Sequence, residues 1–336
     1  MKAIKQLVIG DVHLKQNNLD VAEQLFKLID ESLLKHYPDK LVFLGDIYDT
    51  KAIIRSEAQN FLIEKLLAIQ SKYPKMPIII IVGNHDLEHL ATNENALRPL
   101  DLIQNVKVVD RFLVEDDCAY INYFHNNSDF NNILNQIPHS CKWVFCHQGF
   151  DGFDYGNGIV DQSGFKANGY DKWFICGHYH KYQEKGNVLY LGTPFSHSFG
   201  EVNQDKFIAM FDSSIGDSPS ECMLKILTSK CLPSHKKVTF KDGEKFCLSN
   251  VESKDLIEIV VECKQNEVEK YGKDWALKEL GFEPSQLRVK YEFIDEQVNI
   301  RIKENQSFEE MVKEYLEKKN LSKYYNASIS LLSEVS

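Results

Sequence analysis

The sequence predicts an α/β fold in which two β-sheets pack face to face and helices cover the outside. Apolar runs at residues 4–9, 41–44 and 78–82 alternate with apolar residues at helical spacing, which is typical of parallel strands joined by helices. Beyond residue 106 the helical patterns become sparse while short apolar runs continue, which indicates a second sheet. These later runs lie at residues 106–109, 119–123, 143–146, 173–176, 188–191 and 207–211.

Two helices are expected between the first three strands. Leu19, Phe26 and Leu33 belong to one apolar stripe at helical spacing. The second helix should begin at Ser56, where Gln59 three residues later completes a capping-box pattern. The β-branched run at residues 78–82 is typical of a strand that is covered on both faces.

A smaller α/β domain is expected in the last third of the chain. Residues 213–220 are rich in Ser, Gly and Pro, which indicates a loop and divides the chain into domains at 1–215 and 220–336. The apolar segment 324–332 should either pack on its own domain or bind a partner. Expected elements of this domain are strands at 237–240, 256–263 and 287–293, a helix at 266–280, and a helix that ends near residue 319 after the capping-box pair Ser307 and Glu310.

The composition is that of a water-soluble globular protein, with 336 residues, 43% of them hydrophobic and 26% charged. Its net charge of −10 lacks the basic excess with which proteins usually bind nucleic acid unaided, so metal ions or a partner would have to attract a polynucleotide. The eight cysteines show no repeated CxxC spacing, which fits a reducing cytoplasm. We find no signal peptide and no apolar run near 18 residues, so no membrane association is expected.

Five short motifs stand at the ends of predicted strands and carry the residues suited to chemistry. Strand ends of this kind meet at one edge of an open α/β sheet, where ligands usually bind. Because side chains alternate along a strand, pairs such as Asp11 and His13, or His178 and His180, leave on the same side. The motifs are Gly10-Asp11-Val12-His13, Gly45-Asp46-Ile47-Tyr48-Asp49, Gly83-Asn84-His85-Asp86, Cys146-His147-Gln148 and Gly177-His178-Tyr179-His180.

This ligand set contains imidazole, carboxylate and carboxamide groups but no thiolate, which favours Mn, Fe or Zn over Ca or a structural zinc. We expect two divalent cations about 3.5–4 Å apart, with Asp46 bridging them. Such a pair lowers the pKa of a bound water towards about 7 and neutralises charge on phosphate oxygens, so it suits phosphate-ester hydrolysis.

Each residue also has an ordinary structural interpretation. Asp46 could cap a helix, Asn84 could adopt a left-handed turn conformation, and His85 could be a turn or core histidine. The ordered recurrence of five such motifs argues against this, because every strand end would need its own coincidence. His89 and His197 lie close to the motifs and could support the ligands from behind.

The motifs GDVH, GDIYD, GNHD, a lone histidine and GHYH resemble those of the calcineurin-like metallophosphoesterases. That resemblance implies a two-sheet αββα sandwich. Protein phosphatases of the superfamily carry GDxxDRG and GNHE, whereas this chain has Lys51-Ala52 and GNHD, which argues against that branch. The resemblance implies one metal held by Asp11, His13, Asp46 and His180, and another held by Asp46, Asn84, His147 and His178.

The same resemblance implies roles for two further residues. His85 would be the acid that protonates the leaving oxygen. Asp49 would orient His85, as carboxylates commonly do for imidazoles. A narrower match lies in the segment from Tyr190 to Glu201, YLGTPFSHSFGE, which resembles the segment after the last metal ligands of SbcD-type nucleases.

The SbcD-type resemblance implies a Mn-dependent exonuclease and endonuclease acting on DNA ends in repair and recombination. Mg, Fe or Zn are the alternative metals. The implied partners are DNA, an SMC-like ABC ATPase of the SbcC type and a second copy of the chain, with a small α/β capping domain after the nuclease domain. The resemblance covers residues 1 to about 212, and the rest only by the order of its elements.

Two other functions remain open from sequence alone. One is a phosphodiesterase acting on small nucleotides or other phosphate esters, which the appended domain and the GTP…SFGE segment argue against. The other is a tethering scaffold that has lost its chemistry. No expected ligand is missing from the chain, and His85 is present too, so the sequence shows no sign of such loss.

Overall fold

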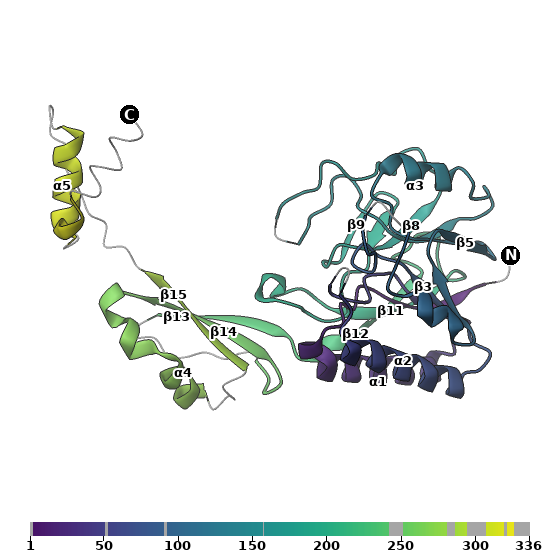
Figure 1. Ribbon diagram of the computed structural model, residues 1–336, viewed down its shortest axis with the longest axis horizontal. Coiled ribbons are helices and arrows are strands. Elements are labelled where there is room, and N and C mark those ends of the chain that lie inside the picture. Colours follow the sequence, from purple (N-terminus) through teal and green to yellow (C-terminus); the bar gives the residue numbers. More distant parts are fainter. Residues whose placement is uncertain are drawn as a thin grey trace. The chain divides into compact units, whose positions relative to one another are not determined.

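The computed structural model describes residues 3–50, 53–90, 93–156, 158–241, 251–280, 286–293, 307–318 and 321–325. Two six-stranded sheets and three α-helices form its larger part (Figure 1). This is the predicted αββα sandwich. Among the described residues, no helix combines the length and the apolar character that crossing a bilayer requires.

The first sheet has the strand order β12-β11-β1-β2-β3-β4. Its strands β1 to β4 are parallel, as the alternation of strands and helices predicted, and β11 and β12 add two antiparallel strands beside β1. Its strands are β1 (Lys5–Ile9), β2 (Lys40–Phe43), β3 (Ile78–Ile81), β4 (Val106–Val109), β11 (Phe207–Asp212) and β12 (Met223–Leu227).

The second sheet has the order β5-β6-β7-β8-β10-β9, in which β6, β7, β8 and β10 are parallel and the two outer strands antiparallel. His147 is paired with Gly177 across β7 and β8, which brings two of the predicted motifs side by side. Its strands are β5 (Phe112–Glu115), β6 (Cys118–Ile121), β7 (Trp143–His147), β8 (Trp173–Gly177), β9 (Gln183–Lys185) and β10 (Val188–Tyr190).

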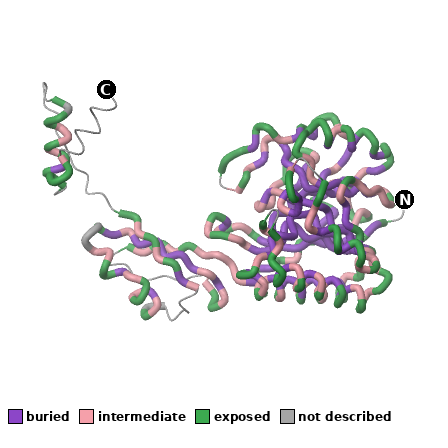
Figure 2. The backbone as a smooth tube through the Cα atoms, in the orientation of Figure 1, coloured by how far each residue is buried: buried purple, intermediate pink, exposed green. Residues whose placement is uncertain are grey.

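The alternation of side chains along each strand separates three apolar layers. In β1, Val8 belongs to the layer between the two sheets, whereas Leu7 and Ile9 pack with helices α1 (Leu19–His36) and α2 (Ser56–Lys72). A third layer lies between the second sheet and α3 (Asn127–Leu134). Figure 2 shows the buried residues concentrated along these strands, which provides a rigid frame for the strand ends.

Several details differ from the prediction. Helix α2 begins at Ser56, but its N-cap is Arg55 and the cap has no side-chain hydrogen bond, so the expected capping box is absent. The sequence also did not predict the short edge strands β5, β9 and β12, or helix α3. Edge strands and a helix rich in asparagine carry weak apolar patterns, so the sequence does not predict them.

The chain divides into two compact units, one of residues 1–237 and 250–257 and one of residues 238–249 and 258–336. The loop at 213–220, predicted as the boundary, instead joins β11 to β12 within the first sheet. The first unit therefore reaches further along the chain than expected, because β12 completes its sheet.

From residue 235 onward, the described residues agree with the predicted order of strands and helices. A three-stranded sheet has the order β13-β14-β15, and Phe240 and Trp275 pack their rings 4.9 Å apart between strand and helix. Ser307 and Glu310 form the predicted reciprocal capping box. Most of the apolar segment 324–332 lies outside the described residues. The elements are β13 (His235–Lys241), β14 (Leu256–Cys263), η5 (Gln265–Tyr271), α4 (Lys273–Leu280), β15 (Leu287–Phe293) and α5 (Phe308–Lys318).

Candidate metal centre

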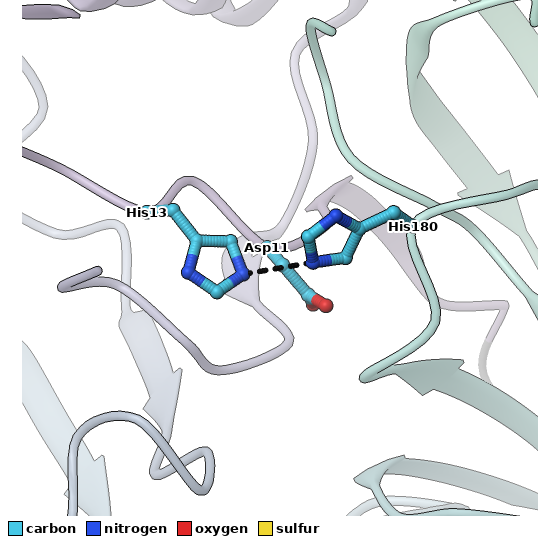
Figure 3. A group of neighbouring side chains, drawn as sticks. All are labelled: Asp11, His13 and His180. Atoms are coloured by element: carbon cyan, nitrogen blue, oxygen red, sulfur yellow. Dashed lines mark hydrogen bonds between the residues drawn. The ribbon is translucent and has the colours of Figure 1, made fainter. Parts of the chain in front are cut away.

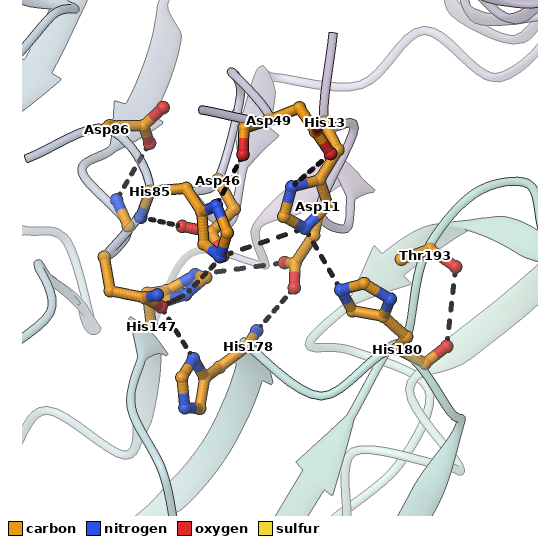
Figure 4. Close-up of polar contacts among 12 residues, drawn as sticks. Asp11, His13, Asp46, Asp49, His85, Asp86, His147, His178, His180 and Thr193 are labelled. Carbon is orange, nitrogen blue, oxygen red and sulfur yellow. Dashed lines mark hydrogen bonds and ion pairs between the residues drawn. The ribbon is translucent and has the colours of Figure 1, made fainter. Parts of the chain in front are cut away.

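The five motifs converge at the carboxyl ends of the strands, as the sequence predicted (Figure 4). Strands β1, β2 and β3 of the first sheet and β7 and β8 of the second contribute one motif each. Both sheets therefore supply polar groups to one buried cluster between their edges. Its predicted members are Asp11, His13, Asp46, Asp49, Asn84, His85, His147, His178 and His180.

The backbone is strained where it presents these side chains. The φ angles of His13, Asp46 and His178 are 47°, 46° and 96°, in the left-handed region that residues other than glycine rarely adopt. Gly83 and Gly177 allow close approach, because a Cβ on either would overlap a carboxylate oxygen of Asp46 or Asp11. Packing in the surrounding sheets must therefore offset the cost of these backbone conformations.

One half of the cluster consists of Asp46, Asn84, His147 and His178. Asn84 Oδ1 lies 2.9 Å from His147 Nε2 and 2.8 Å from His178 Nδ1, and Asp46 Oδ2 lies 3.3 Å from His147 Nε2. His147 Nδ1 lies 2.9 Å from the carbonyl oxygen of Leu44, which can only accept, so Nδ1 carries the hydrogen. A neutral His147 therefore turns a lone pair towards two oxygen acceptors, and a cation between them would satisfy all three.

The other half consists of Asp11, His13 and His180 (Figure 3). The Nε2 atoms of His13 and His180 lie 3.1 Å apart. His180 Nδ1 faces the Glu201 carboxylate at 2.9 Å and donates to it, which leaves its Nε2 as an acceptor in the neutral ring. Asp11 Oδ1 is buried without a hydrogen-bond partner among the described residues. A cation between these atoms would satisfy them.

Asp46 connects the two halves. Its Oδ2 lies 3.8 Å from His13 Nε2 in one half and 3.3 Å from His147 Nε2 in the other, while its Oδ1 accepts the backbone N–H of His85 at 2.8 Å. Ligand atoms of each of the triads Asp11-His13-His180, His13-Asp46-His85 and Asp46-His147-His178 lie within 4.8 Å of one another. The arrangement suits two neighbouring cations that share one carboxylate.

Electrostatics supports the same conclusion. Burial and the nearby Asp46 raise the pKa of Asp11 to about 7, against the attraction of His147. Burial alone would lower the pKa of His147, but the carboxylates of Asp46 and Asp11 outweigh it and raise that pKa to about 10. Burial and the neighbouring imidazole of His147 lower the pKa of His178 to about 3. A proton on His147 and a bound cation would each offset the negative charge of these carboxylates.

His85 stands beside the cluster with its ring 4.9 Å from that of His13. The structure differs here from the predicted role of Asp49, because His85 Nδ1 donates to the backbone carbonyl oxygen of Asp49, at 2.7 Å. The Asp49 carboxylate instead lies 3.2 Å from Lys15 Nζ and 3.8 Å from His13 Nδ1. The carbonyl still fixes the tautomer of His85 and leaves its Nε2 free to exchange a proton.

Sequence reasoning missed the structural role of Asp86, the last residue of the GNHD motif. Its Oδ1 accepts the backbone N–H groups of Ile47 and Tyr48, and its Oδ2 accepts that of Gly83. Asp86 therefore ties the loop of Asp46 to the loop of Asn84. The burial of the carboxyl is the largest influence that raises its pKa to about 7.

Two further residues support His180 and had no assigned role. Glu201 contacts His180 through Oε1, and its Oε2 lies 2.8 Å from Lys206 Nζ, with both side chains largely buried. Lys206 also donates to the hydroxyl of Thr193 at 2.7 Å and to the carbonyl oxygen of His180 at 2.8 Å. Glu201 ends the SFGE sequence that was singled out, but nothing in the sequence pointed to Lys206.

His197, suggested as a supporting residue, lies behind the half that contains His180. Its ring centroid is 5.3 Å from that of His13 and 5.7 Å from that of His180. Its two ring nitrogens are buried and have no hydrogen-bond partner among the described residues. The ring packs against that of Phe195, with centroids 4.6 Å apart, and so fills space beside the predicted ligands His13 and His180.

Comparison with known proteins gives a consistent result. The family model described as Calcineurin-like phosphoesterase matches residues 4–205, which is more than half of the chain. Protein 244L of Invertebrate iridescent virus 6, named as a candidate phosphoesterase, is 26% identical over 281 residues, covering 80% of this chain and 92% of that protein.

Two other relatives carry more specific names. Exonuclease subunit 1 of Enterobacteria phage T4 is 29% identical over 187 residues, covering 50% of this chain and 51% of that protein. UDP-2,3-diacylglucosamine hydrolase of Shewanella halifaxensis (strain HAW-EB4) is 29% identical over 152 residues, covering 43% of this chain and 60% of that protein. The chain thus matches only about half of the length of the phage protein.

Proposed function

Because this chain belongs to the calcineurin-like phosphoesterase family, we propose that it hydrolyses DNA phosphodiesters as the nuclease subunit of an end-processing complex. The observation that carries the proposal is the cluster of carboxylates and imidazoles around Asp46, whose facing acceptor atoms two neighbouring cations would satisfy. The likeness to a protein named Exonuclease subunit 1 favours DNA among phosphate esters.

In the proposed mechanism, the two halves of the cluster would hold two divalent cations, with Mn the expected metal. When bound, these cations would supply a hydroxide at neutral pH and offset the negative charge that develops on phosphate oxygens. The ligands would be Asp11, His13, Asp46 and His180 for one cation, and Asp46, Asn84, His147 and His178 for the other.

The chain's own residues would supply the proton and the orientation. Protonated on both ring nitrogens, His85 would give the Nε2 proton to the leaving oxygen and keep its Nδ1–H on the carbonyl oxygen of Asp49. That hydrogen bond would keep the ring edge turned towards the site throughout the reaction. The buried carboxylate of Asp86 would preserve the spacing between the loops that carry Asp46 and Asn84.

Positive side chains beside the site would help to position the DNA backbone. Lys15 and Arg55 line a pocket of about 300 Å³ that adjoins Leu14 and Tyr48, next to the ligand His13. These two basic side chains are few for binding a polyanion such as DNA, and the protein's net charge of −10 opposes the approach of DNA. We therefore expect an SMC-like ABC ATPase to contribute to DNA binding, and a second copy of the chain to complete the nuclease.

The second candidate is a phosphodiesterase that acts on small nucleotides or related esters. The relative named UDP-2,3-diacylglucosamine hydrolase favours it, since that name specifies a nucleotide-linked substrate. The two candidates differ in what they cleave, and not in the chemistry of the cluster.

Assays of linear DNA and of bis-p-nitrophenyl phosphate with Mn, with and without the partner ATPase, separate the two candidates. We expect DNA cleavage that EDTA abolishes and that the ATPase increases. Hydrolysis of the small ester with DNA left intact, even with the ATPase present, would favour the second candidate. Failure to cleave either substrate would contradict both.

A further inference from the structure

A pocket of about 440 Å³ opens beside the candidate metal centre. Its volume falls within the range of small-molecule sites, about 300–1,000 Å³. It lies in the first compact unit, next to β6 and α3, and includes Leu87, which follows the GNHD motif by one residue. Its polar and aromatic lining includes Asn93, Arg111, Tyr123, Phe124, His125 and Gln136.

Tyr123 forms the wall shared by this pocket and the metal centre. Its ring centroid lies 5.6 Å from that of His178 and 6.2 Å from that of His147, both predicted metal ligands. Its backbone N–H donates to the carbonyl oxygen of Val82 at 2.9 Å, which fixes it beside the loop of Asn84. A ligand whose phosphate lies at the metal centre can therefore extend directly against this ring.

The chemistry of the lining selects a flat, polar-edged ring system. Tyr123 and Phe124 offer aromatic surface for stacking, which every nucleobase can use. Asn93, Gln136 and Arg111 add amide and guanidinium groups, which can hydrogen-bond to the polar edge of a stacked base. A phosphate would find a single arginine there, opposed by the carboxylate of Asp129 among the lining residues, so a second phosphate site is disfavoured.

We propose that this pocket binds the nucleobase of the nucleotide attached to the phosphate being cleaved. The proposal rests on the proposed phosphodiester hydrolysis and names the part of the substrate that lies beside the cations. It holds for a DNA strand and for a small nucleotide, because both carry a base one sugar away from the phosphate. Stacking accepts every base, so it predicts selection of nucleotides over base-free esters with little sequence preference.

Calorimetric binding tests this proposal without relying on turnover. The probes are the four 2′-deoxynucleoside 5′-monophosphates and deoxyribose 5-phosphate, which has the same sugar and phosphate but no base. With the Mn-loaded protein, we expect at least one nucleotide to bind about tenfold tighter than the base-free probe. Tyr123→Ala should remove most of that difference, whereas Tyr123→Phe, which keeps the ring, should preserve it.

A matched control is Tyr37→Ala, which removes an exposed tyrosine (74% exposed) remote from the pocket and should leave both affinities unchanged. If Tyr123→Ala binds neither probe, the exposed residue Arg111 provides the replacement variant Arg111→Ala, for which we expect the same loss of preference.

Two results would overturn the base pocket. One is equal affinity of the wild-type protein for all five probes, or no binding of any. The other is a preference for nucleotides that survives both Tyr123→Ala and Arg111→Ala. Either result would leave the proposed hydrolysis standing if DNA or the small ester is still cleaved, so the two proposals fail separately.

Discussion

The two halves of the candidate metal centre are supported by different kinds of contact. His147 is held by a backbone carbonyl, that of Leu44, at the end of β2. His180 is held by the Glu201 side chain, which in turn is paired with Lys206. The first support belongs to the sheet and no side-chain substitution removes it, whereas the second depends on a buried ion pair that one substitution can break.

Asp46 belongs to both halves, so its removal should have the largest effect. Asp46→Asn keeps the size of the side chain but removes the shared negative charge. We expect metal content to fall at both positions and activity to fall on the order of ten-thousandfold, because several kcal/mol of charge stabilisation would be lost. Elemental analysis and a kinetic assay check both effects.

The exposed Asp20 in the first turn of α1 offers a matched control, Asp20→Asn, which should change neither quantity. Normal metal content in Asp46→Asn would show that this carboxylate does not join the two halves.

His85 should affect chemistry without affecting either half. His85→Ala removes the proposed proton donor while the ligand triads Asp11-His13-His180 and Asp46-His147-His178 remain intact. We expect activity to fall about a thousandfold and metal content to stay near that of the wild-type protein. Cleavage at the normal rate would refute the assigned role of His85.

The side-chain support should be the more easily weakened of the two. Glu201→Gln can still hydrogen-bond to His180 but no longer neutralises Lys206. We expect metal loss confined to the half that contains His180, with activity reduced about 10- to 100-fold. Glu31→Gln, an exposed site on α1, serves as the control. Equal metal loss from both halves would contradict the separation between them.

In the half that the backbone supports, His147 should make the stability of the metal-free protein depend on pH. The raised pKa of His147, about 10 against an ordinary 6.5, means that the folded protein holds a proton that the unfolded chain releases between these values. In the metal-free protein, the contribution of this proton to folding stability is therefore fully present below pH 6.5 and is lost as the pH rises towards 10.

Melting temperatures in EDTA should fall over this range, and added Mn should reduce the fall by replacing the proton. This effect should be the smallest of the four. A melting temperature that stays constant over this pH range in EDTA would show that His147 carries no such proton.

Much of this architecture could be predicted because its causes are local in sequence. The parallel strands are runs such as Ile78–Ile81, which are buried on both faces and carry a strong pattern. The ligands follow those strands directly, so their convergence is a consequence of strand direction. The family relationship that the motifs indicated is confirmed over residues 4–205.

The remainder depends on contacts between distant segments, which a sequence pattern does not encode. Glu201 and Lys206 matter because the fold places both beside His180, although each alone resembles an ordinary surface charge. The contact between His85 and Asp49 uses a backbone carbonyl, and any residue at that position could supply it. The boundary between the units lies later in the chain than predicted, because β12 joins the sheet that contains the N-terminal strand β1.

Anomalous X-ray scattering from crystals grown with Mn tests the central claim most directly. Our account predicts two peaks about 3.5–4 Å apart on either side of the Asp46 carboxylate, one beside His13 and His180 and the other beside His147 and His178. A single peak, or peaks away from Asp46, would contradict it.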